Sequence, residues 1–192
     1  SFAAFAGGRM AHRALISAAG ELFDREAGIV KLLTPPFDLG DKSPGYIAGY
    51  VPGVRENGGQ YTHAAVWLGM ACLENGMRDT GWEVLSAIAP DGREQSVYRS
   101  EPYAICADVY SNPQHRGRGG WSWYTGAAGW YHQAVMGSLL GIRVCRGWLT
   151  VKPNIPENWQ GFDAVFRSGG AQVRIRVARG KGENSHPEGI YL

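Results

Sequence analysis

Residues 50–63 read Tyr-Val-Pro-Gly-Val-Arg-Glu-Asn-Gly-Gly-Gln-Tyr-Thr-His, a stretch that sets polar groups among glycines and aromatic rings. Between Arg55 and His63 it supplies a guanidinium, a carboxylate, two carboxamides, a hydroxyl and an imidazole. An ordinary core segment is not built this way, because buried polar groups are costly unless they are paired. The composition is typical of a loop that binds a polyhydroxylated ligand. A second such run, residues 117–126, reads Gly-Arg-Gly-Gly-Trp-Ser-Trp-Tyr-Thr-Gly.

Apolar residues at helical spacing predict helices around both runs. The Asn75-Gly76 pair is a stop signal for the helix that follows the first run. Asp79 is a suitable N-cap for the next helix, and the Pro- and Gly-rich segment 31–50 is predicted to be a loop. The predicted helices cover 10–23, 59–75, 79–88 and 121–140, with a short helix after Pro102.

The hydrophobic pattern changes toward the C-terminus. Alternation at period two predicts antiparallel strands at 148–151, 162–166 and 171–177. Residues 155–161 connect the first two of these strands, and the polar segment 180–192 has no clear element. The chain is therefore predicted to be mainly α, with a β region at its C-terminal end.

The bulk composition excludes several classes of function. A length of 192 residues normally means one domain, or one and a piece of another. A net charge of +2 is too small to favour nucleic acid or an anionic membrane surface. The sequence contains no CxxC, HxxE or HExxH pattern and no run of about 18 apolar residues, so we expect neither a metal site nor a transmembrane helix.

The cysteines and the first residues bear on the cellular compartment. Cys72, Cys106 and Cys145 are odd in number and set in apolar sequence, so buried free thiols in a reducing compartment are expected. The segment 1–6 lacks an initiator Met and a charged region, and it is not expected to be a signal peptide. It looks like a cut into the middle of a helix.

Several segments together resemble glycoside hydrolase family 94, the inverting phosphorylases of cellobiose and chitobiose and the phosphorylase-like domain of cyclic β-1,2-glucan synthases. The resemblance implies the C-terminal part of an (α/α)6 barrel over residues 1–145, then the start of an antiparallel β-sandwich over 146–192. Four helices cannot close a barrel of twelve, so we expect a fragment of a larger catalytic protein. The segments that carry the resemblance are 32–38, 55–63, 101–103, 107–111, 119–130, 151–156 and Trp159.

The resemblance implies a phosphate site. His63 matches the family's phosphate-binding histidine, and Thr125 matches a threonine that contacts the attacking phosphate. Gly126 would let an oxyanion approach the backbone amides at a helix N-terminus. The alternatives are a histidine satisfied early in a helix and a plain threonine cap.

A sugar site is implied as well. A guanidinium and a carboxylate suit paired sugar hydroxyls, so Arg55 and Glu56 are predicted to bind the donor sugar, although a surface ion pair is the simpler interpretation. Trp121 is predicted to stack on a pyranose ring, because glycines flank it, although such tryptophans are more often core residues. The predicted substrate-binding set also contains Gln60, Glu101 and Tyr103. For Glu101 and Tyr103, helix capping is the alternative.

The implied reaction is phosphorolysis of a β-linked gluco-oligosaccharide to an α-glycosyl phosphate. Inorganic phosphate is the co-substrate and no cofactor is expected. The family's general acid is an aspartate in a Trp-Asn-Asp-Gly-type motif that this sequence lacks, so no catalytic residue is assigned and the chain alone is expected to be inactive.

The other expectations concern partners and alternatives. The partners are the remainder of the polypeptide and a second copy in a homodimer, without nucleic acid. The protein is expected in the cytoplasm, or at a membrane if the parent is a cyclic glucan synthase. A non-catalytic carbohydrate-binding module and a helical-barrel glycosidase with paired carboxylates near Glu56 and Glu101 remain open.

Overall fold

The computed structural model describes residues 8–38, 40, 44–123, 125–168 and 170–180. The chain divides into two compact units, Ser1–Asn154 and Ile155–Leu192. The first unit contains the helices and most of the short strands, and the second contains one long hairpin. Both polar runs of the sequence lie in the first unit.

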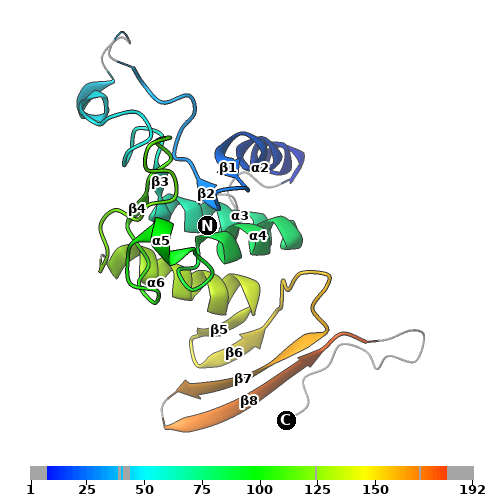
Figure 1. Ribbon diagram of the computed structural model, residues 1–192. Coiled ribbons are helices and arrows are strands. Elements are labelled where there is room, and N and C mark those ends of the chain that lie inside the picture. The colour runs from blue at the N-terminus through cyan, green and yellow to red at the C-terminus, as the bar shows by residue number, and fades with distance from the viewer. Residues whose placement is uncertain (1–7, 39, 41–43, 124, 169, 181–192) are drawn as a thin grey trace. The chain divides into compact units, whose positions relative to one another are not determined.

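The first unit combines helices with short two-stranded antiparallel sheets (Figure 1). Helix α6 continues without a break into η2, a π-helical segment. The helical elements are α2 (Gly8–Leu22), η1 (Gly45–Gly49, a 3-10 helix), α3 (Thr62–Glu74), α4 (Arg78–Ile88), α5 (Gln95–Tyr98), α6 (Thr125–Gln133) and η2 (Ala134–Leu139). The strands are β1 (Phe23–Asp24), β2 (Ile29–Val30), β3 (Gln60–Tyr61), β4 (Asp108–Val109), β5 (Ile142–Cys145) and β6 (Trp148–Val151).

Helix α3 is the base on which the first unit is built, because α2, α4, α6 and η2 all pack against it. Its contact with α4 depends on two glycines. A Cβ added at Gly69 would lie 2.9 Å from Leu85 Cδ2, and one added at Gly81 would lie 2.6 Å from Leu73 Cγ. The two helices therefore approach one another more closely than any larger residue at these positions allows.

The second unit is a two-stranded antiparallel hairpin formed by β7 (Gly161–Ser168) and β8 (Ala171–Ala178). Partly buried residues alternate with exposed ones along β8. On one face Phe162 pairs with Val177 and Ala164 with Ile175. This is the period-two pattern of a strand with one covered face.

The long predicted elements are confirmed. The helices predicted at 10–23, 59–75 and 79–88 correspond to α2, α3 and α4, and α3 ends at Glu74 with Gly76 at a positive φ of 79°. The strands predicted at 148–151, 162–166 and 171–177 lie within β6, β7 and β8.

Three local predictions are wrong. Asp79 lies in the first turn of α4 and Met77 is the N-cap. The short helix α5 precedes Pro102, because the Glu94 carboxylate accepts from the backbone N–H of Ser96 at 3.2 Å and starts the helix there. Helix α6 begins at Thr125 and not at residue 121, because the backbone of 118–121 bonds to 107–110.

Two further findings concern β5, which the sequence did not predict. It pairs with β6 in an antiparallel hairpin of the first unit. Cys145, on β5, is exposed, whereas Cys72 and Cys106 are buried free thiols as expected. The first unit extends to Asn154, and the domain boundary after residue 145 stays a prediction. Most of the segment 180–192 lies outside the described residues.

The helix contact at Gly81 predicts a matched pair of stabilities. Gly81→Ala adds a methyl group where Leu73 is fully buried, and overpacking should lower the free energy of unfolding by about 1–3 kcal/mol. Gly20→Ala adds a methyl group in α2, where nothing lies within 4 Å. Because alanine has a higher helix propensity than glycine, this substitution should raise the free energy of unfolding by up to about 1 kcal/mol. Urea unfolding followed by circular dichroism checks both. Equal effects of the two substitutions would contradict the close packing.

Candidate functional site

Strand β4 brings the two polar runs of the sequence together. On one side it pairs with β3, with Tyr61 opposite Asp108. On the other side Gly120 N donates to Asp108 O at 2.9 Å, and Ala107 N donates to Trp121 O at 2.6 Å. Residues from the segments 50–63 and 117–126 therefore flank one short strand.

Asn57 fixes the loop that carries Arg55 and Glu56. The Asn57 side chain is fully buried and makes three hydrogen bonds to backbone groups. Its Oδ1 accepts from Phe37 N at 2.7 Å, and its Nδ2 donates to Phe37 O at 3.0 Å and Tyr50 O at 2.9 Å. Asn57 thus has a structural role, whereas its neighbours Arg55 and Glu56 line a cavity.

The loop and β4 enclose a cavity of about 130 Å³. The Arg55 backbone has a positive φ of 49°, and its guanidinium carbon lies 4.8 Å from the Trp121 ring centre. Arg55 Nε lies 3.7 Å from Glu56 Oε2, an ion pair that is too long for a hydrogen bond. The Trp121 side chain is 61% exposed. The cavity is lined by Arg55, Glu56, Tyr61, Ala107, Asp108 and Trp121.

Asp108 is the buried carboxylate of this cavity, and it is only 2% exposed. Its Oδ1 accepts from the backbone N–H of Trp121 at 3.1 Å, whereas its Oδ2 is buried without a hydrogen-bond partner among the described residues. Burial raises the pKa of this carboxyl above its ordinary value. The Trp121 N–H and the Arg55 charge oppose the rise in pKa, and the Glu56 charge adds to it.

His63 lies in the first turn of α3 within a group of aromatic rings. Its ring is stacked with Tyr61 at 6.2 Å between ring centres and packs edge-on against Trp67 at 4.6 Å. The Trp130 ring lies 5.6 Å away and is tilted by 37°. His63 Nε2 is buried and has no hydrogen-bond partner among the described residues. A Cβ placed on Gly126 would lie 3.9 Å from His63 Nδ1, so these two predicted phosphate-binding residues are neighbours.

Thr125 is the first residue of α6, one position before Gly126. Its backbone is therefore at the helix start that the sequence predicted for an anion site. The Thr125 side chain lies outside the part of the chain that the structure describes. Its contact with phosphate stays a prediction.

Gln60 serves the fold directly. It is 1% exposed, and its Oε1 accepts from Val30 N at 3.0 Å while its Nε2 donates to Thr62 Oγ1 at 3.1 Å. The amide therefore ties β2 to the start of α3. These two hydrogen bonds hold the start of α3 in place. A contact between Gln60 and substrate stays a prediction.

Glu101 and Tyr103 form a separate, more exposed group with Trp123. Glu101 accepts from Trp123 Nε1 at 2.8 Å and from Ser100 Oγ at 2.9 Å. The Trp123 hydrogen bond is the main reason that the pKa of Glu101 falls to about 2. Tyr103 is 72% exposed and lies 6.0 Å from the Trp123 ring. Neither Glu101 nor Tyr103 lines the small cavity.

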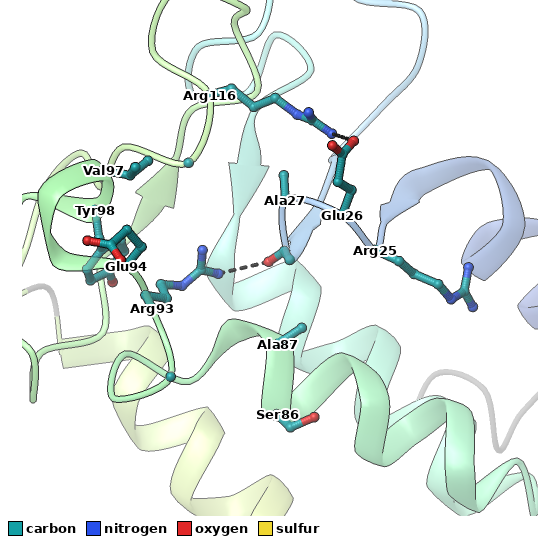
Figure 2. A pocket seen from close by; sticks show the side chains of 13 residues that line it. Arg25, Glu26, Ala27, Ser86, Ala87, Arg93, Glu94, Val97, Tyr98 and Arg116 are labelled. Atoms are coloured by element: carbon teal, nitrogen blue, oxygen red, sulfur yellow. Dashed lines mark hydrogen bonds and ion pairs between the residues drawn. The ribbon is translucent and has the colours of Figure 1, made fainter.

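A larger cavity of about 490 Å³ lies between the β1–β2 turn and α5 (Figure 2). Its arginines are engaged within the fold: Arg25 pairs with Glu83, Arg116 pairs with Asp24 and Glu26, and Arg93 donates to Gly28 O at 2.9 Å. None of the predicted phosphate- or sugar-binding residues lines it. The smaller cavity is therefore the candidate functional site.

Among the described residues, no group of His, Cys, Asp or Glu side chains could hold a metal ion. Over the same residues, no helix is both long enough and apolar enough to cross a membrane.

Comparison with known protein families decides the classification. The profile of the Glycosyl hydrolase 94 superfamily, catalytic domain, matches residues 1–141. The chain belongs to glycosyl hydrolase family 94. The match spans the first polar run, β4 and the second polar run, which are the elements that build the small cavity.

Curated relatives of this family 94 chain differ in activity. It is 42% identical over 172 residues to the cyclic beta-(1,2)-glucan synthase NdvB of Rhizobium meliloti (strain 1021), covering 87% of this chain and 6% of that protein. It is 33% identical to a solabiose phosphorylase of Paenibacillus borealis, covering 75% of this chain and 19% of that protein. It is 28% identical to an N,N'-diacetylchitobiose phosphorylase of Vibrio furnissii, covering 84% and 20%. The chain thus spans only 6–20% of the length of these relatives.

The sequence reasoning missed Asp108 as a site residue of the family 94 chain. Residues 107–111 carry part of the family resemblance, but the resemblance gives no role to the aspartate among them. The sequence did hold a signal, because Asp108 is the one charged residue in the otherwise apolar stretch 104–109. An aspartate is rarely buried unless it has a partner. Only the pairing of β4 with both polar runs shows which residues the carboxylate faces.

The bonds of Asn57 predict a strong effect on stability. Asn57→Ala leaves the N–H of Phe37 and the carbonyls of Phe37 and Tyr50 without their partner. Unsatisfied buried groups cost about 1–3 kcal/mol each, and partial hydration of the loop offsets some of this. We expect the free energy of unfolding to fall by about 2–3 kcal/mol. Denaturant unfolding measures the change, and a loss below about 0.5 kcal/mol would contradict the assigned role.

Asp108 predicts a pH-dependent stability. Because burial raises its pKa above 3.8, the folded state binds a proton more tightly than the unfolded state. The protonated Asp108 carboxyl therefore contributes its full stability below pH 3.8, and this contribution is lost as the pH rises through the folded-state pKa. Asp108→Asn does not titrate, so its advantage in unfolding free energy over the unmutated protein should grow from about pH 4 to pH 7. Urea unfolding across this range checks the trend, and an advantage that stays constant or shrinks would contradict it.

Proposed function

We propose that the chain is the C-terminal portion of an inverting glycoside phosphorylase-type glycosyltransferase. It contributes residues that bind sugar and phosphate for the conversion of a β-linked gluco-oligosaccharide to an α-glycosyl phosphate. The observation that supports this most is the arrangement around β4. A cavity with Arg55, Glu56 and Trp121 lies beside this strand, and its partner strand β3 runs directly into the start of α3, where His63 lies next to Gly126.

We also infer the architecture of the parent protein from its membership of family 94. Residues 1–145 would be the C-terminal part of an (α/α)6 barrel, and 146–192 the start of an antiparallel β-sandwich. The packing of helices around α3 supports a helical part, and the antiparallel β7–β8 hairpin supports a β part after it. The compact units divide after Asn154, so the boundary after residue 145 rests on the family resemblance. The remainder of the barrel would come from the rest of the polypeptide, and association of two copies is expected.

The sugar would be held by charge-assisted hydrogen bonds. Arg55 and Glu56 offer a donor and an acceptor beside the exposed face of Trp121, and such a face suits a pyranose ring. Gln60 would act by holding the start of α3. Glu101 and Tyr103, grouped with Trp123, would contact a more distant part of the oligosaccharide.

The phosphate would be held by His63, by Thr125 and by the backbone at Gly126. An oxygen of inorganic phosphate attacks the anomeric carbon as the bond from that carbon to the leaving oxygen breaks, with inversion. The leaving oxygen takes a proton from a carboxylic acid, and the proton of the phosphate restores that acid. No cofactor or metal enters this sequence.

The acid would come from the remainder of the parent protein. Glu101 is unsuited to the role, because its pKa of about 2 keeps it ionised at neutral pH and a general acid needs a pKa near the working pH. In a glycosidase that pairs Glu56 with Glu101, an ionised Glu101 could serve only as the base or nucleophile. The chain alone is therefore expected to be inactive.

A carbohydrate-binding module is the second candidate. The observation that favours it is the exposure of Trp121 at 61%, Trp123 at 68% and Tyr103 at 72%, because exposed rings can stack on sugars without any chemistry. It differs from the first proposal in one testable respect. A binding module would bind sugar with no dependence on phosphate.

His63→Ala in the full-length protein tests the proposal. We expect the KM for inorganic phosphate to rise about 10- to 100-fold, because a hydrogen bond to an anion is lost, while the KM for the β-linked oligosaccharide changes little. Release of α-glucose 1-phosphate, with each substrate varied in turn, measures both constants. The exposed His132→Ala is the matched control and should behave as the unmutated enzyme. Absence of phosphate-dependent cleavage by the full-length protein would favour the binding module.

A further inference from the structure

Three polar atoms of the small cavity's residues share an unusual state. Arg55 Nε, Glu56 Oε2 and Asp108 Oδ2 are all buried, and none has a hydrogen-bond partner among the described residues. The three side chains line one cavity. Arg55 Nε lies 3.7 Å from Glu56 Oε2.

Such a cluster is costly for the folded protein. A buried polar group without a hydrogen-bond partner lowers the stability of the folded state, and a charged group lowers it more. Asparagine in place of Asp108 would keep the acceptor for Trp121 N and avoid the buried charge. A sequence that keeps the carboxylate at this cost is typical of a functional site, where the missing partner is a ligand.

The chemistry of the three atoms selects the ligand. Two carboxylate oxygens need donors, and one guanidinium N–H needs an acceptor. A phosphate would satisfy Arg55 and be repelled by both carboxylates, and a cation would meet the reverse conflict. A hydroxyl both donates and accepts, so a pair of neighbouring hydroxyls on a neutral sugar satisfies all three atoms together.

The dimensions of the site agree with one sugar ring. The cavity of about 130 Å³ is well below the roughly 300–1,000 Å³ of pockets for drug-sized ligands. Gly120 leaves the room that Asp108 occupies, since a Cβ on Gly120 would lie 2.3 Å from Asp108 Oδ1. Trp121 gives the cavity an exposed aromatic flank.

We propose that Asp108 is a specificity-determining residue: its carboxylate accepts a hydrogen bond from a free hydroxyl of the donor sugar and completes a three-residue clamp with Arg55 and Glu56. This inference rests on the proposed phosphorylase function and adds a selection rule to it. A sugar that lacks this hydroxyl leaves Asp108 Oδ2 buried without a hydrogen-bond partner. The site therefore favours an unsubstituted gluco-configured ring over a deoxy analogue.

The test is Asp108→Asn in the full-length protein, with a β-1,2-linked glucose disaccharide and inorganic phosphate as substrates. We expect kcat/KM for the disaccharide to fall about 10- to 100-fold, because a hydrogen bond to a charged group is lost. The KM for phosphate should stay within about twofold of that of the unmutated enzyme. The variant should unfold at the same or a higher temperature. Asp91→Asn, the same change at an exposed aspartate, is the control.

Monodeoxy analogues of α-glucose 1-phosphate, used as donors in the synthetic direction, identify the hydroxyl. One of them should be a poor donor for the unmutated enzyme, and Asp108→Asn should not make it poorer, because a shared interaction is lost only once. Equal penalties for every analogue in both enzymes would overturn the inference. So would an Asp108→Asn variant that is less stable but retains its sugar constants, since that is the behaviour of a structural residue.

Calorimetric titration of the disaccharide separates this inference from the proposed function. If the full-length protein cleaves nothing, the phosphorylase proposal fails, and the titration still compares sugar affinity with and without the Asp108 carboxylate. Weaker binding by Asp108→Asn supports the clamp. Equal binding, or no binding by the unmutated protein, refutes it.

Discussion

The backbone pairing of β4 on both of its edges is the interaction on which the candidate site depends. One edge holds β3 and thereby sets the start of α3, where His63 lies. The other edge holds the backbone of Gly120 and Trp121. Without this strand of two residues, the segments 50–63 and 117–126 would be unrelated loops. With it, a guanidinium, two carboxylates and an indole surround one small cavity.

The site therefore combines a rigid base with loops whose shape is set by hydrogen bonds. Helix α3 is packed on several sides, and its contact with α4 is tight because of Gly69 and Gly81. The loop above it has little apolar packing of its own and relies on buried polar side chains, above all Asn57 and Gln60. Binding groups placed on such loops keep their geometry only while these internal bonds are intact.

The sequence predicted the long, periodic elements and failed where structure depends on contacts between distant segments. Helices α2, α3 and α4 and the β7–β8 hairpin have enough residues to show a period. Strands of two residues show none, so β3 and β4 could be found only from their pairing. For the same reason composition marked Arg55 and Glu56 as a site but could not reveal that Asp108 faces them. It also could not distinguish Gln60, which is bonded inside the fold, from its neighbours.

The left-handed backbone at Arg55 has a consequence for how this site can change over time. Glycine or asparagine would adopt the φ of 49° with less strain, yet neither carries a cation. The position thus holds two demands in conflict, and the surrounding turn, closed by the bridge between Val54 and Asn57, resolves the conflict in favour of the guanidinium. Substitutions that loosen this turn would relieve the backbone strain at Arg55 and would also move its guanidinium away from the cavity. The stability of the turn and ligand binding by the cavity are consequently expected to change together.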